Sequence, residues 1–117
     1  MPVALKLKNN TLTVCLKGDI DHHTAPAIRE SIDDAIAVNH NANHIILDFS
    51  GVTFMDSSGV GLVMGRYRLL APMGKKLQVD NLSARDYQIL RMSGIEKLAP
   101  LNHRYHEEKE NSYDKNK

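Results

Sequence analysis

The chain has 117 residues, 42% of them hydrophobic and 25% charged, which are the proportions of one ordinary globular domain. Its 15 Lys and Arg residues nearly balance its 14 Asp and Glu residues, and a net charge of +1 excludes a global field that recruits nucleic acid or an anionic membrane. The single cysteine, Cys15, excludes an intrachain disulfide, and its place within an apolar alternation predicts a buried, unreactive thiol.

The first predicted elements are two strands. Apolar side chains alternate with other residues over 3–7 and again over 12–16, which is the period of a half-buried strand. Asn9 and Asn10 lie between the two segments, and asparagine tolerates the positive φ that a tight hairpin turn requires. We therefore expect an antiparallel hairpin at the start of the chain.

The period then changes to that of a helix. Apolar residues recur at the spacing of one helix face, at Ile28, Ile32, Ala35 and Ile36. Asp21 or Thr24 can cap this helix, and Pro26 is tolerated in its first turn, where no intrahelical bond is lost. The polar residues 39–43 end it.

The next elements alternate between strand and helix. Residues 45–49 form a short apolar run, which suits a central strand covered on both faces. Helical spacing over 60–70 and strand alternation over 76–80 follow. Residues 83–86, Ser-Ala-Arg-Asp, resemble a capping box for a last helix that Gly94 ends.

These elements predict an α/β fold with a mixed sheet of four to five strands, an N-terminal antiparallel hairpin and helices on the faces of the sheet. The last short strand is expected at Leu98 and Ala99. We assign residues 1–100 to one domain and residues 101–117 to a polar C-terminal helix or disordered tail.

The segment 48–61 carries most of the functional information, because it leads from the buried strand into a helix. Asp56, Ser57 and Ser58 are all helix-capping residues, since their short side chains can accept hydrogen bonds from free backbone N–H groups. Gly59, Gly61 and Gly65 then lie inside the helix, where each costs about 1 kcal/mol relative to alanine. Close packing of the helix on the sheet, or a partner near the backbone, would offset this cost.

The residues alone leave several interpretations of this segment open. It is either only a helix cap, or a site where free N–H groups and the helix dipole hold a phosphate on a serine. A nucleotide-binding module is a further alternative, although no lysine follows the glycines as in a P-loop. A hydrolase lacks support, because no Gly-x-Ser-x-Gly motif surrounds Ser57 or Ser58. The histidines show no spacing typical of a closed metal site.

A family resemblance narrows these alternatives. Residues 54–61, Phe-Met-Asp-Ser-Ser-Gly-Val-Gly, with Gly-Asp-Ile-Asp at 18–21, resemble the STAS domain of bacterial anti-anti-sigma factors. Residues 21–25, Asp-His-His-Thr-Ala, and 64–67, Met-Gly-Arg-Tyr, point to the members that act in sporulation rather than in general stress. The resemblance covers about residues 1–100, with Val60 where relatives often carry leucine.

The resemblance implies a STAS fold and a protein that binds an anti-sigma factor, itself a serine kinase of the GHKL type. Binding would release a sporulation sigma factor, phosphorylation on Ser57 would end the interaction, and a PP2C-type phosphatase would restore it. Asp21 and Asp56 match acidic residues beside the phosphoserine, and Ser58 and Gly59 complete its surroundings. We expect a monomer with no cofactor, metal, catalytic residue, nucleic-acid partner or membrane partner.

The same expectations place the protein in the cytoplasm. Residues 1–6 show neither the basic nor the apolar segment of a secretory signal. No apolar run in the sequence approaches the length of a membrane span.

Overall fold

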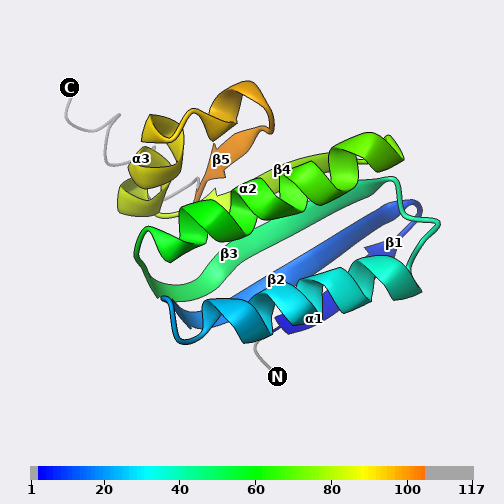
Figure 1. Cartoon of the computed structure of the whole chain (residues 1–117), viewed down its shortest axis with the longest axis horizontal. Helices are drawn as coiled ribbons and strands as arrows, with labels where there is room; N and C mark the ends of the chain where they lie inside the picture. Colours follow the sequence, from blue (N-terminus) through cyan, green and yellow to red (C-terminus); the bar gives the residue numbers. More distant parts are fainter. Residues whose placement is uncertain (1–2, 105–117) are drawn as a thin grey trace, which may run out of the picture.

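The computed structural model describes residues 3–104, which form one five-stranded sheet in the order β1-β2-β3-β4-β5 (Figure 1). Strand β1 is antiparallel to β2, and the other neighbouring pairs are parallel. The predicted mixed α/β sheet is therefore confirmed. The elements are β1 (Val3–Lys8), β2 (Thr11–Ile20), α1 (Ala25–Val38), β3 (His44–Met55), α2 (Ser58–Leu70), η1 (Ala71–Met73), β4 (Lys76–Leu82), α3 (Ala84–Met92), η2 (Ile95–Lys97) and β5 (Leu101–His103).

The predicted hairpin is also confirmed. Lys8 of β1 pairs with Thr11 of β2, and only Asn9 and Asn10 connect the strands. Asn9 has a φ of 56°, the left-handed conformation that asparagine adopts more readily than most residues.

Helices α1 and α2 lie side by side across the same face of the sheet (Figure 1). The apolar side chains beneath them are buried and form the centre of the core: Leu12, Val14, Leu16, Ile45, Leu47 and Phe49. On the opposite face Ile46 is only half-buried, and its neighbours in the sheet are Thr13 and Gln78. The prediction that this central strand is covered on both faces is wrong. Ile46 is an isolated apolar residue on a polar face. Because it lies between Ile45 and Leu47, which face the core, the sequence of this strand reads as one continuous apolar run.

Cys15 lies on this open face and is half-buried, so the prediction of a buried thiol is wrong in part. Its Sγ donates to Oδ2 of Asp48 over 3.7 Å. Burial and the negative charge of Asp48 raise the pKa of the thiol, which disfavours the reactive thiolate.

The C-terminal part of the sheet follows the prediction at its start and departs from it at its end. Oγ of Ser83 accepts from the backbone N–H of Asp86 over 3.1 Å, as a capping box requires, and Gly94 has a φ of 89° after the helix. The last strand, however, is Leu101–His103 rather than Leu98 and Ala99, because η2 occupies the residues just before Leu98.

The structure therefore continues the sheet past residue 100, into the segment assigned to the tail. The predicted helix or disorder of the remaining tail, residues 105–117, lies outside the described residues. In the part that is described, no helix combines the length and the hydropathy needed to cross a membrane.

Candidate functional site

The candidate site lies where β2 and β3 end and α1 and α2 begin. Ile20 pairs with Met55 at the ends of these parallel strands, and the backbone N–H of Asp56 donates to the carbonyl oxygen of Ile20 over 3.1 Å. This pairing brings the segments that contain Asp21 and Asp56 to one edge of the sheet. Ligands and partners commonly meet α/β proteins at this edge.

Hydrogen bonds fix the start of α1 locally. Oδ1 of Asp21 accepts from the backbone N–H groups of His23 and Thr24 over 2.9 and 3.0 Å. Oγ1 of Thr24 accepts from the N–H of Asp21 over 3.0 Å and donates to the carbonyl oxygen of Asp19 over 2.8 Å. The pKa of Asp21 lies below its usual value, mainly because the backbone N–H of Thr24 donates a hydrogen bond to the Asp21 carboxylate.

The start of α2 is arranged differently. Oδ1 of Asp56 accepts from the N–H of Ser58 over 2.8 Å, and its carbonyl oxygen accepts from the N–H of Gly59 over 3.0 Å. The N–H of Val60 donates to the carbonyl oxygen of Ser57 over 3.1 Å. We expected free N–H groups that could hold a phosphate here, and for these three residues that expectation is wrong. The N–H groups of Ser58 and Gly59 already donate to Asp56, and the N–H of Val60 already donates to Ser57.

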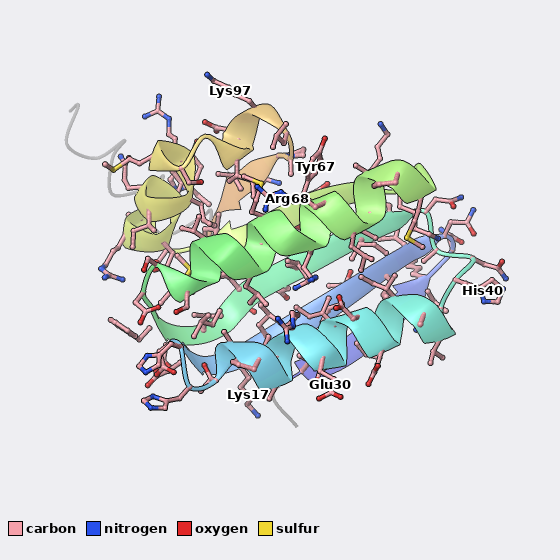
Figure 2. All side chains as sticks on the ribbon, viewed as in Figure 1. Lys17, Glu30, His40, Tyr67, Arg68 and Lys97 are labelled. Carbon is pink, nitrogen blue, oxygen red and sulfur yellow. The ribbon has the colours of Figure 1, made fainter. Side chains whose placement is uncertain are left out.

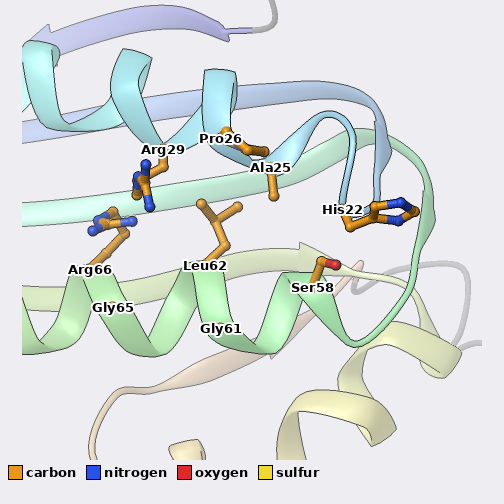
Figure 3. Close-up of a pocket in the computed structure, with 9 residues that line it drawn as sticks. All are labelled: His22, Ala25, Pro26, Arg29, Ser58, Gly61, Leu62, Gly65 and Arg66. Atoms are coloured by element: carbon orange, nitrogen blue, oxygen red, sulfur yellow. The ribbon is translucent and has the colours of Figure 1, made fainter.

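Ser57 and Ser58 differ in their surroundings. Ser57 occupies the N-cap position of α2 and is exposed, but its side chain makes no capping hydrogen bond. Ser58 is half-buried and its side chain faces α1, beside His22 (Figure 3). The hydroxyl of Ser57 is therefore accessible to another protein and has no capping role.

The three glycines of α2 also differ. A Cβ atom on Gly59 would overlap Sδ and Cγ of the fully buried Met55, so this glycine permits close packing of α2 on β3. A Cβ atom on Gly61 or Gly65 would meet no described atom within 4 Å apart from the adjacent residues and the backbone of α2 itself. The predicted packing role therefore holds for Gly59 and is wrong for Gly61 and Gly65, which face outward from the core.

Gly61 and Gly65 instead border an open groove between α1 and α2, with a volume of about 380 Å³ (Figure 3). We call it the α1–α2 groove. Its lining residues are His22, Ala25, Pro26, Arg29, Ser58, Gly61, Leu62, Gly65 and Arg66.

Sequence reasoning missed this groove and its two arginines. Arg29 and Arg66 are far apart in the sequence, and only the packing of α1 beside α2 brings them together. The spacing of Gly61 and Gly65 along one face of α2 is the available signal, but the sequence leaves open whether that face packs on the sheet or meets a partner.

A second feature that the sequence did not indicate lies beside the Asp56 loop. Nη1 of Arg85 donates to the carbonyl oxygen of Met55 over 2.8 Å, and its guanidinium lies 5.2 Å from the centroid of the Phe54 ring. The Phe54 side chain is exposed, so an aromatic ring and a cation lie together on the surface at the end of β3, the strand that leads to Ser57. Aromatic residues and arginine are the types that most often dominate protein interfaces. Within residues 3–104, no cluster of His, Cys, Asp or Glu side chains could hold a metal ion.

Comparison with known families identifies the domain. The STAS domain family matches residues 2–108 of this chain, which is nearly its whole length. The chain belongs to the STAS family. The resemblance to STAS anti-anti-sigma factors that the sequence predicted is thereby confirmed.

Individual STAS proteins agree with this assignment. The anti-sigma F factor antagonist of Paenibacillus polymyxa is 34% identical over 101 residues, which is 86% of each chain. The solved structure of the anti-sigma factor antagonist SpoIIAA in its unphosphorylated form superposes with a TM-score of 0.70 at 30% identity, covering 98% of this chain and 97% of that one. The Bacillus cell fate determinant SpoIIAA in its phosphorylated form gives a TM-score of 0.65 at 31% identity, covering 98% and 99%.

Proposed function

We propose that this STAS protein is an anti-anti-sigma factor whose control point is Ser57. In the unphosphorylated form it binds an anti-sigma factor that is also a serine kinase of the GHKL type, and a sporulation sigma factor is released. The kinase phosphorylates Ser57 and so ends the interaction, and a PP2C-type phosphatase restores the binding form. The protein acts as a monomer in the cytoplasm, without catalysis of its own.

The observation that carries this proposal is the state of the Ser57 hydroxyl. It is exposed at the start of a helix, and it makes no capping bond whose loss would disturb the fold. A kinase can therefore approach it without unfolding the domain. The names of the relatives support the same function, because they are antagonists of anti-sigma factors and one neighbour is known in a phosphorylated form.

The negative charge of the phosphate is what weakens binding of the partner in this proposal. A phosphate on Ser57 adds about −1.5 to −2 charges at pH 7, directly beside Asp56 and on the edge of the sheet that also carries Asp21. The N–H groups of Ser58, Gly59 and Val60 already have acceptors, so the phosphate should stay on the surface rather than enter the helix start. A partner that docks on this edge then meets added negative charge and bulk.

The test is phosphorylation of the purified protein by its cognate anti-sigma kinase with ATP, followed by intact-mass measurement. Wild type and Ser58→Ala should each gain one phosphate group, and Ser57→Ala should gain none. Ser58→Ala is the matched control, because it removes the neighbouring hydroxyl on the same helix. A phosphate found on Ser57→Ala would show that another residue is the acceptor.

Binding of the same proteins to the kinase separates recognition from modification. Ser57→Ala should bind as tightly as the unmodified wild type and remain bound when ATP is present. Wild type should dissociate as phosphorylation proceeds, and addition of a PP2C-type phosphatase should restore binding. Loss of binding by Ser57→Ala without ATP would contradict the proposed role of the hydroxyl.

A further inference from the structure

The α1–α2 groove is kept open by two glycines that have no packing role. Each costs about 1 kcal/mol in a helix interior relative to alanine. Apart from the adjacent residues and the backbone of α2 itself, no atom of the described residues lies within 4 Å of where their Cβ atoms would be, so the core gains nothing from them. What they provide is bare helix backbone along one wall of the groove (Figure 3).

Two arginines stand together at one end of this groove. The Arg66 side chain on α2 is only 9% exposed, and the guanidinium of Arg29 on α1 lies next to it (Figure 3). Burial lowers the pKa of Arg66, Asp33 counteracts that effect, and the positive charge of Arg29 adds to the lowering. Burying one guanidinium beside another is unfavourable unless negative charge is close by.

Asp33 compensates this positive charge in part. Its Oδ1 lies 2.9 Å from Nε of Arg66, but the N–H is not aligned with the oxygen, so neither atom gains a hydrogen bond from the contact. None of the described residues that line the groove is acidic. Glu30 lies on the side of α1 that faces away from α2 (Figure 2). One carboxylate beside two guanidinium groups leaves the end of the groove positively charged.

We propose that the α1–α2 groove binds a small organic molecule through an oxyanion, a phosphate or carboxylate, held by Arg29 and Arg66. A guanidinium carries five N–H donors in a fork that matches such groups, and Asp33 contacts Arg66 at Nε. The body of the molecule lies over Gly61, Gly65 and Leu62, and Ser58 and His22 offer polar groups at the far end.

The dimensions of the groove fit a small molecule. Its volume of about 380 Å³ lies within the range of small-molecule sites. Ser58 and Arg66 are separated by roughly 12 Å along the helix, at about 1.5 Å of rise per residue. This length exceeds that of a bare phosphate ion, so the site should prefer an oxyanion that carries an apolar or planar group.

The test uses phenyl phosphate, with inorganic phosphate and phenol as partial probes. In a titration of the isotope-labelled full chain followed by NMR, phenyl phosphate should shift the amide signals of Gly61 and Gly65 to saturation. Inorganic phosphate should bind more weakly, and phenol should produce no saturable shift. Absence of saturable shifts with phenyl phosphate would overturn the proposal.

Three variants assign the binding to the groove. Arg29→Gln should weaken phenyl phosphate binding about tenfold, as expected for loss of a charged hydrogen-bond donor. Arg68→Gln, which removes an exposed arginine of α2 outside the groove, should have no effect. Gly65→Leu should fill the groove and abolish binding without lowering the unfolding free energy. Equal weakening by Arg29→Gln and Arg68→Gln would mean unspecific attraction and would also overturn the proposal.

The remaining alternative is that the arginines receive an acidic side chain of a protein partner. That source is distinguished by measuring the anti-sigma kinase with the same variants. If Arg29→Gln weakens kinase binding while phenyl phosphate does not bind wild type, the small-molecule site is overturned. The proposal is independent of the Ser57 switch, because Ser57 does not line the groove and Ser57→Ala should bind phenyl phosphate like wild type.

Discussion

Helices α1 and α2 begin at the same edge of the sheet with similar residues, but the two starts are held in different ways. At α1 the hydroxyl of Thr24 both accepts and donates a hydrogen bond, and Asp21 accepts two more. At α2 Asp56 supplies the cap and Gly59 packs against Met55, while the Ser57 hydroxyl has no capping bond. A hydroxyl at a helix start is thus structural in one case and available for modification in the other.

Phosphorylation of Ser57 should give the largest effect that this comparison predicts. The affinity for the anti-sigma partner should fall by more than about a hundredfold, or about 3 kcal/mol. The free energy of unfolding should change by less than about 1 kcal/mol, because the hydroxyl supports no capping contact and a negative charge at an exposed helix start contributes no more than that. Titration calorimetry and urea unfolding of both forms measure the two quantities.

Structures of both forms give the decisive control for that prediction. A backbone shift well beyond about 1 Å along α2 would favour a conformational mechanism over local electrostatics. Ser57→Asp adds a single negative charge, so it should weaken binding less than the phosphate does but in the same direction. Tight binding by Ser57→Asp would count against charge as the cause.

Substitution of Gly59 should be the largest purely structural perturbation at the start of α2. Gly59→Ala places a methyl group against buried Met55, and we expect a loss of about 1–3 kcal/mol in unfolding free energy. Gly61→Ala is the matched control, because the same change meets open space there and should stabilise the helix by up to about 1 kcal/mol. Thermal melts of the two variants that shift in the same direction would refute the distinction.

At the start of α1 the expected change is smaller and involves hydrogen bonds. Thr24→Val keeps the shape of the side chain but removes its bonds to Asp21 and Asp19, and each lost hydrogen bond should cost about 0.5–1.5 kcal/mol. Ser57→Ala, the equivalent removal at α2, should cost less than about 0.5 kcal/mol. Urea unfolding of both variants decides whether the two hydroxyls really differ in structural role.

The fold could be predicted because its signals are local. Asn9 and Asn10 form the hairpin turn, and Ser83 caps α3 by accepting from the N–H of Asp86. Each of these features involves residues that are close together in the sequence. The failures come from properties that depend on distant segments. The open face of β3 depends on which side the helices cover, and Ile46 gives no local indication of this.

The candidate site was predictable only in part, for the same reason. The motif at residues 56–59 identified the strand-to-helix turn, but not that Asp56 would satisfy the N–H groups we had expected to be free. Whether Gly61 and Gly65 face the sheet or a groove depends on the rotation of α2 about its axis. The pairing of Arg29 with Arg66 depends on the distance between two helices, which no sequence period encodes.

The smallest expected effects are on the pH dependence of stability, where two aspartates at helix starts should respond to acid with opposite signs. Hydrogen bonds from the backbone of Thr24 and His23 lower the pKa of Asp21 below its unfolded value. Its stabilising contribution is therefore present above about pH 4 and is lost as the pH falls through the folded pKa. Burial raises the pKa of Asp86 at the start of α3, although Ser83 and Arg85 oppose the change. Its contribution is present below about pH 4 and is lost as the pH rises through the folded pKa.

The variants Asp21→Asn and Asp86→Asn separate these two contributions when urea midpoints are measured from about pH 3 to 6. Relative to wild type, Asp21→Asn should lose less stability towards acid, because it carries no carboxylate to protonate. Asp86→Asn should lose less stability as the pH rises, because a neutral amide has no charge to desolvate in a buried position. Glu30→Gln, on the exposed side of α1, serves as the control for an ordinary surface carboxylate. If the urea midpoint of Asp21→Asn changes with pH as that of wild type does, the hydrogen bonds at the start of α1 do not depend on the charge of Asp21. The difference between the starts of α1 and α2 then rests on the hydroxyl of Thr24 alone.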